Sequence, residues 1–235
     1  MKVRVKFSKY GIMKFIGHLD VMRYFQKAIR RAGIDIVYTE GLSPHMVMSF
    51  ASPLGVGLTS DAEYMDIEIK TPVTSAEAIA ALNRVGVEGI QVTGFYQIPE
   101  GKANKAMTLV AAADYTLRFR KGYEPKLDWQ SGISHFFAQK SITVMKKTKK
   151  SEKEVDIRPM IYEMSVNAGT VFMKLSSGSV ANLKPELVMD AYLATLGIEP
   201  EPFAYEIHRC EVYADMGTEG RRNLVPLDRL GEEIL

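Results

Sequence analysis

The stretch that decides the fold is "MKFIGHLDVMRYFQKAIRRAG", Met13–Gly33. It follows a short run, "VRVKF" at 3–7, in which polar and apolar residues alternate with the period of a β-strand. From about residue 17, apolar residues recur at spacings of three or four, which predicts a helix with one buried face. The members of this stripe are Leu19, Met22, Phe25, Ile29 and Ala32. A strand followed directly by an amphipathic helix predicts a fold in which helices pack on a sheet.

The segments after this helix continue in the order of a split βαβ unit. Three strands are predicted at "DIVYTE" (35–40), "HMVMSFA" (45–51) and "EYMDIEI" (63–69). A second helix is predicted at "SAEAIAALNRV" (75–85), with a Ser or Thr cap before it, and a closing strand at "GIQVTGFYQI" (89–98). Each helix stripe needs a sheet face to cover it, so the order indicates an α+β unit.

The same order recurs in the second half of the chain. Strands are predicted at 114–121, 141–147, 160–166, 170–176 and 204–214, and helices at 128–140 and 184–197. We therefore predict two tandem ferredoxin-like (split βαβ) units, each an antiparallel sheet backed by helices. The predicted boundaries are 1–100 for the first unit, 101–112 for a linker, 113–213 for the second unit and 214–235 for a polar C-terminal tail.

The composition is that of a soluble globular protein: 46% of the 235 residues are hydrophobic and 25% are charged. No apolar run approaches the roughly 20 residues that a membrane-spanning helix needs. The first residues do not resemble a signal peptide, so a cytoplasmic location without membrane contact is expected. Cys210 is the only cysteine, which excludes an internal disulfide, a cysteine-ligated zinc site and an iron–sulfur cluster held by several thiolates.

The net charge of +2 is unevenly distributed along the chain. Residues 1–31 hold nine Lys or Arg and one acid, giving +8, so the remainder carries −6. Four bases of the predicted helix share one face at spacings of three or four. They are Arg23, Lys27, Arg30 and Arg31, and a second basic run contains Lys146 and Lys147. These residues form a predicted anion-binding surface, most plausibly for RNA, and the alternative is an ordinary solvated face.

Polar and glycine-rich residues cluster in four segments of the first half: 17–20, 40–45, 52–58 and 63–69. If they meet at the ends of one sheet, four side chains could form an acid–base site: His18, Asp20, His45 and Glu63. The cleft around them would be lined by Gly41, Pro44, Pro53, Gly55, Gly57 and Tyr64. No His-x-x-His or His-Glu-x-x-His spacing occurs, so no metal site is predicted. The structural alternative is that these residues only begin a helix and form turns.

The segment from Lys9 to Ile69 resembles the start of the radical-SAM-linked domain of unknown function, the DUF2344 family. The matching motifs are Gly-His-Leu-Asp at 17–20, Arg-Arg-Ala at 30–32, Gly41 with Pro44 and His45, Pro-Leu-Gly at 53–55, and Glu63 with Tyr64. "DIRPMI" at 156–161 and "IHR" at 207–209 are also similar to the family. The resemblance extends to about Tyr213.

Family members occur as separate chains or as extensions of radical SAM proteins, and their molecular activity is not established. The resemblance therefore implies an accessory or substrate-recognition protein that acts with a radical SAM protein, on RNA or a ribosome-linked target. The chain has one cysteine and lacks the three-cysteine motif, so the iron–sulfur cluster and S-adenosylmethionine are expected only on that partner. The alternatives are an enzyme in its own right, using a His/Glu acid–base or metal site, and a purely structural scaffold.

Overall fold

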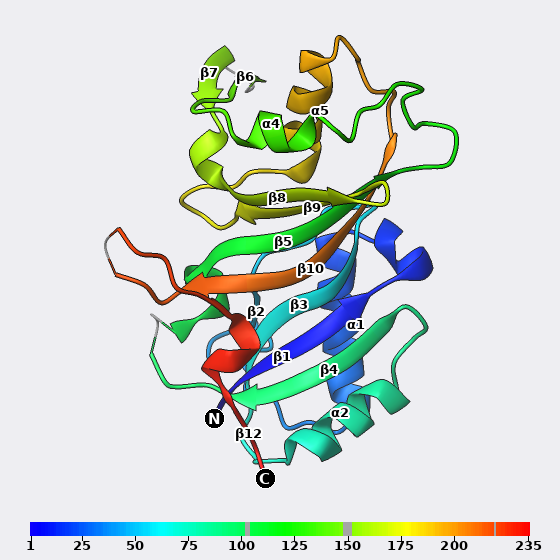
Figure 1. Cartoon of the computed structure of the whole chain (residues 1–235). Coiled ribbons are helices and arrows are strands. Elements are labelled where there is room, and N and C mark those ends of the chain that lie inside the picture. The colour runs from blue at the N-terminus through cyan, green and yellow to red at the C-terminus, as the bar shows by residue number, and fades with distance from the viewer. Residues whose placement is uncertain (102–103, 148–151, 219) are drawn as a thin grey trace. The chain divides into compact units, whose positions relative to one another are not determined.

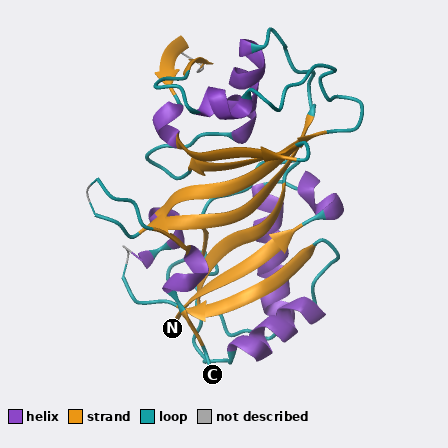
Figure 2. Ribbon diagram, in the orientation of Figure 1, coloured by secondary structure: helices purple, strands orange, loops and turns teal. Residues whose placement is uncertain are grey.

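A computed structural model of the chain describes residues 1–101, 104–147, 152–218 and 220–235 (Figure 1). The chain divides into two compact units. The first comprises Met1–Ala111 and Arg209–Leu235, and the second comprises Ala112–His208. Both combine helices with mostly antiparallel sheets (Figure 2). Among the described residues, no helix is both long enough and apolar enough to cross a membrane.

The first unit has the element order predicted from its sequence. Its elements are β1 (Lys2–Lys9), the 3₁₀ helix η1 (Gly11–Phe15), α1 (His18–Arg31), β2 (Met48–Phe50), β3 (Thr59–Glu68), α2 (Ser75–Arg84), β4 (Ile90–Gln97) and the short α3 (Ala106–Leu109). The antiparallel pairs place β1 between β4 and β3, and β2 pairs with β3. The predicted strand at 35–40 is reduced to two isolated bridges.

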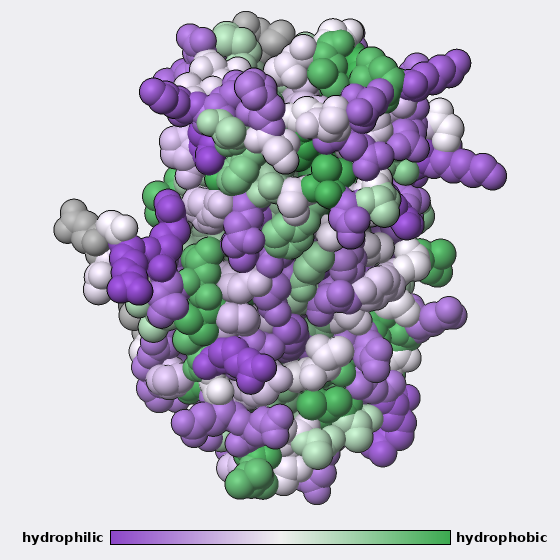
Figure 3. All heavy atoms as spheres, in the orientation of Figure 1, coloured by the Kyte–Doolittle hydropathy of each residue, from purple (hydrophilic) through white to green (hydrophobic). Residues whose placement is uncertain are grey.

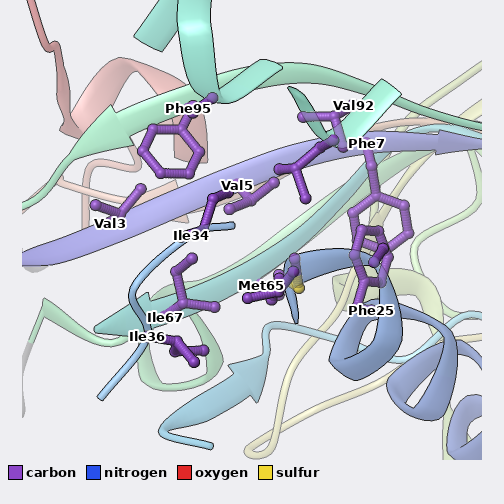
Figure 4. Close-up of a cluster of buried hydrophobic side chains, with 14 of the residues drawn as sticks. Val3, Val5, Phe7, Phe25, Ile34, Ile36, Met65, Ile67, Val92 and Phe95 are labelled. Atoms are coloured by element: carbon purple, nitrogen blue, oxygen red, sulfur yellow. The ribbon is translucent and has the colours of Figure 1, made fainter. Parts of the chain in front are cut away.

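The main core of this unit lies between its sheet and the two helices α1 and α2 (Figures 1 and 4). Alternate residues of β1 point into it, namely Val3, Val5 and Phe7, as the period of a strand requires. The ring centroids of Phe7 and Phe25 are 4.6 Å apart, in an edge-to-face arrangement. This contact fixes how α1 lies against β1.

The buried stripe of α1 differs from the predicted one. The structure buries Val21, Phe25, Ala28 and Ile29, whereas Leu19 is 60% exposed and Met22 is only half-buried. The two stripes share Phe25 and Ile29, which the spacing predicted correctly. The error arose because a helix with apolar residues on more than one side admits several stripes, and packing on β1 selects one of them.

The C-terminal segment adds strands to the first unit's sheet and, through residues 227 and 228, contacts the face of that sheet opposite the helices. Its elements are β10 (Tyr205–Asp215, from Arg209 onward in this unit), β11 (Leu224–Pro226), the 3₁₀ helix η4 (Leu227–Leu230) and β12 (Glu232–Glu233). Strand β11 pairs with β10, β12 pairs with β4, and Leu227 is fully buried. On this face, polar and apolar residues are interspersed at the surface (Figure 3). The description of 214–235 as a tail is therefore wrong, because this segment is an integral part of the first unit.

The second unit contains β5 (Val110–Phe119, from Ala112), α4 (Ile133–Phe137), β6 (Thr143–Lys147), β7 (Glu152–Asp156), the 3₁₀ helix η3 (Arg158–Met160), β8 (Ile161–Asn167), β9 (Thr170–Ser176), α5 (Pro185–Thr195) and the start of β10. Its main sheet has the order β10-β5-β9-β8, and β6 and β7 form a separate two-stranded sheet. The sequence analysis missed β7. It also predicted a linker at 101–112, whereas α3 and the start of β5 occupy 106–111.

We expect Leu227→Ala to destabilise the first unit by about 2–5 kcal/mol, because it empties a fully buried site under η4. Urea unfolding followed by circular dichroism measures this change. Leu235→Ala is the matched control, since Leu235 is fully exposed and should cost less than about 0.5 kcal/mol. Equal stability of the two variants would show that the C-terminal segment does not contribute to folding.

Candidate functional site

The basic residues of α1 lie on its solvent face. Arg23, Lys27, Arg30 and Arg31 are all exposed, on the side of the helix away from the buried stripe. Arg23 forms an exposed ion pair with Asp20, at 3.4 Å between Nη1 and Oδ1. The other three bases form no ion pair within the described ranges of the chain. We call these four residues the basic face. Arg30 and Arg31 also lie in the last turn, where positive charge interacts favourably with the helix dipole.

The second predicted basic run cannot be placed in the same way. Lys146 and Lys147 belong to β6, but their side chains lie outside the described part of the structure, as do residues 148–151. The basic face therefore rests on α1 alone.

His18 and Asp20 lie in the first turn of α1, and their contacts there are those of residues that stabilise the fold. The half-buried His18 ring packs edge-on against Phe50, with 5.0 Å between the ring centroids. Asp20 is exposed and pairs with Arg23. A carboxylate in the first turn is favourable at the positive end of the helix dipole. Within the described chain, no carboxylate is hydrogen-bonded to His18.

His45 lies at a different end of the first unit. Thr39 Oγ1 accepts the backbone N–H of His45 and lies 3.1 Å from its Nδ1. The Thr39 hydroxyl thus holds both the backbone and the ring of His45 in place. His45 lines a cavity of about 190 Å³ together with Thr39, Met46, Met48, Ile98 and Lys105. The lining of this cavity thus combines an imidazole and a lysine with apolar side chains.

Glu63 is buried in an ion pair and is not available as a free base. Arg209 donates to both Glu63 carboxylate oxygens at 2.6 Å, and also to the backbone oxygen of Ser52 at 2.6 Å. Lys9 lies in the same region with only 2% of its surface exposed, and donates to the carbonyl oxygen of Ile16 at 3.0 Å. Burial, assisted by the positive charge of Arg209, lowers the pKa of Lys9, although Glu63 opposes this shift.

The structure does not bring the predicted site residues together into one cleft. Strand β2 connects the two regions, since Phe50 pairs with Met65 and Met48 pairs with Ile67. His18 contacts Phe50 at one end of this pairing, whereas His45 precedes Met48 at the other. His45 therefore does not join His18 and Glu63: it lines a cavity that neither of them lines, and β2 is extended, so that each residue between His45 and Phe50 adds about 3.3 Å of separation.

The predicted cleft lining is dispersed for the same reason. Gly41 and Pro44 are exposed in the loop before β2, and Pro53 and Gly55 are exposed in the loop after it. Gly57 is half-buried and donates its N–H to the carbonyl oxygen of Lys14. Tyr64 follows Glu63 in the strand and therefore points to the opposite face, where its hydroxyl donates to Glu211 at 2.7 Å. Burial and the negative charge of Glu211 raise the pKa of Tyr64.

Sequence reasoning missed the partners of the buried charges. Lys6 Nζ donates to Glu211 and to Asp228, each at 2.8 Å, and the fully buried Arg4 binds Asp66. These partners lie 62 to 222 residues away along the chain. The only signal was the presence of charged residues inside predicted strands. In the described residues, no group of three or more His, Cys, Asp or Glu side chains is arranged to hold a metal ion.

A family model matches residues 2–185. The chain belongs to the DUF2344 family. That family is described as an uncharacterized protein conserved in bacteria, so membership establishes the relationship and leaves the activity open. No curated protein matches the chain.

Two solved structures are similar to parts of this DUF2344 protein. One is a chain of the crystal structure of a Cbf5-Nop10-Gar1 complex, at 10% identity and a TM-score of 0.45. The match covers 89% of this chain but only 48% of that one. The other is an unknown protein from Galdieria sulphuraria, at 12% identity and a TM-score of 0.25, with 88% and 96% of the two chains covered. Both likenesses are too distant to assign a function.

We expect Arg209→Met to cost about 3–5 kcal/mol of unfolding free energy, because it leaves the Glu63 carboxylate buried without its partner. The double variant Glu63→Leu/Arg209→Met should recover much of this loss. Arg118→Met is the matched control, since the Arg118–Glu206 pair is exposed and should contribute less than about 1 kcal/mol. A loss no larger than that of the control would refute the structural role of the pair.

Proposed function

We propose that this protein is an accessory or substrate-recognition protein that binds RNA, or a ribosome-linked target, through the basic face and acts with a radical SAM enzyme. The observation that carries the proposal is the exposure of Arg23, Lys27, Arg30 and Arg31 on one side of α1. Only Arg23 has an acidic partner among the described residues. Exposed bases without nearby acids attract phosphate groups and release counterions on binding.

The spacing of these bases suits a polyanion better than a single small anion. The rise of a helix is about 1.5 Å per residue, so Arg23 and Arg31 are separated by about 12 Å along α1. One small anion cannot contact all four side chains over that length, whereas successive phosphates of a nucleic acid can. The four side chains project from an exposed helix surface, which favours contacts to the backbone over readout of base edges.

The radical SAM partner is proposed from the family resemblance. With Cys210 as its only cysteine, the chain supplies too few thiolates for the cluster, so the partner would carry both the cluster and S-adenosylmethionine. Affinity purification from bacteria that express the protein, followed by mass spectrometry, tests this part. We expect a protein with the three-cysteine motif to co-purify, and its repeated absence would count against the partnership.

The alternative, an independent enzyme, has weaker support. Glu63 is neutralised by Arg209, and His45 lies apart from His18 at the 190 Å³ cavity.

The tandem ferredoxin-like arrangement also remains our proposal. Its support is the strand order of the two units. If the strands named here are numbered in chain order within each unit, β4-β1-β3-β2 in the first unit and β10-β5-β9-β8 in the second both become the order 4-1-3-2.

We expect a labelled single-stranded RNA to bind with an affinity that falls steeply between about 50 and about 200 mM salt. Four phosphate contacts would give a log–log slope of about −3, at about 0.7 per contact. Changing Arg23, Lys27, Arg30 and Arg31 to Gln should abolish most of the binding and of the slope. Fluorescence anisotropy measures both quantities.

The control removes the same number of charges elsewhere. Lys70, Lys121, Lys126 and Arg229 are exposed and lie outside α1, so their change to Gln should leave most of the affinity intact. Equal losses in the two variants would mean that net charge alone, and not the basic face, determines binding. An absence of binding at low salt would overturn the proposal.

A further inference from the structure

Large apolar side chains are exposed beside the first turn of α1. Ile12 is 79% exposed, Phe15 is 61% exposed, and Tyr10, Leu19 and Val56 are also exposed. Single exposed apolar residues are common, but several gathered at one place indicate a contact surface. We call these five residues the apolar end.

Three segments bring the apolar end together. Tyr10, Ile12 and Phe15 belong to η1 or precede it, and Leu19 follows in the first turn of α1. The backbone N–H of Gly57 donates to the carbonyl oxygen of Lys14 at 2.7 Å, which holds the loop containing Val56 against η1. Lys14 Nζ lies 5.2 Å from the centroid of the Phe15 ring, so a cation already lies next to this aromatic ring.

The apolar end continues the line of the basic face. Residues 19, 23 and 27 are spaced by four, so Leu19, Arg23 and Lys27 follow one another along the same side of α1. A ligand that extends along the basic face toward the start of the helix therefore reaches Leu19. From there it meets η1 and the exposed ring of Phe15.

The charges determine which part of a ligand the apolar end accepts. Two carboxylates lie beside it: Asp20, which pairs with Arg23, and Asp61, which accepts a hydrogen bond from the Tyr10 hydroxyl. Together with Lys14 and Arg23 they give this end charges of both signs, whereas Lys27, Arg30 and Arg31 have no acidic partner in the described chain and favour phosphate at the other end of α1. The part of a ligand that suits the apolar end is therefore uncharged, planar and apolar, as a nucleobase is.

We propose that the ligand of the basic face is single-stranded RNA, with its phosphates on the four bases of that face and a base stacked on Phe15. This inference rests on the proposed function and adds to it the strandedness of the RNA and the residue that contacts a base. Stacking on an aromatic ring tolerates any sequence, because every base has a π-face. A duplex keeps its bases stacked on one another, so it can offer only phosphates to this surface.

The test compares two probes of equal charge, a single-stranded RNA and the same oligomer with abasic residues. We expect Phe15→Ala to weaken binding of the base-bearing RNA by about 5- to 100-fold and to leave binding of the abasic probe unchanged. Phe15→Trp should retain the affinity, and Tyr123→Ala, which truncates an exposed aromatic residue of the second unit, should have no effect. The salt slope should be the same in all of these variants, because no phosphate contact is lost.

The outcomes separate this inference from the proposed function. If Phe15→Ala changes neither probe, or weakens both equally, while the Gln variant of the basic face still loses binding, stacking is refuted and the proposed function stands. If wild-type protein binds neither probe at low salt, both are refuted. Loss of a co-purifying protein in Phe15→Ala with unchanged RNA affinity would identify the apolar end as a protein-docking surface and would also overturn the inference.

Discussion

The packing of the first unit depends on the hydrogen bonds that the buried guanidinium group of Arg4 donates. Arg4 is fully buried and donates two hydrogen bonds to Asp66, one to the carbonyl oxygen of Asn104 and one to that of Leu227. Asp66 also accepts the N–H of Ala106 at 2.6 Å. A buried guanidinium is tolerated only when its donors find acceptors, because desolvation of an unpaired charge costs several kcal/mol. The Arg4 side chain of β1 therefore has all its hydrogen-bond acceptors only when β3, the segment before α3 and the C-terminal segment are all folded against it.

This requirement explains why the first unit is built from both ends of the chain. The sequence "VRVKF" showed correctly that Arg4 and Lys6 share one face of a strand. Alternation identifies the residues that share a face, but it carries no information about what covers that face. Here the cover is η4, more than 220 residues away. The sequence analysis therefore did not connect the polar face of this strand with the polar stretch at 214–235, although the two are in contact.

The candidate site shows the same division between local and distant information. The basic face could be predicted from spacing alone, because a helix fixes which neighbours share a side within a few residues. The ion pairing of Glu63 could not be predicted, because its partner Arg209 lies 146 residues away and nothing in the local sequence identifies that partner. Tyr64 was grouped with Glu63 by adjacency, yet consecutive strand residues point to opposite faces. Motif proximity along the chain therefore overestimated proximity in space.

The excess of positive charge in the first 31 residues is partly balanced by acids that lie far away along the chain. The bases of β1 are compensated by acids from the rest of the chain, through the pairs Lys2–Glu100, Arg4–Asp66 and Lys6 with Glu211 and Asp228. Lys9 is buried beside the Glu63–Arg209 pair.

Acids from the rest of the chain thus pair with the bases of β1, whereas of the four bases on α1 only Arg23 has an acidic partner in the described chain. The sequence suggested one broad basic region, whereas the fold divides it into two parts with different roles. The charges of β1 hold the sheet to the C-terminal segment, and their removal should affect folding. The charges of α1 make no comparable contacts, so their removal can change binding while leaving the fold intact, which makes the basic face experimentally separable from the structure that carries it.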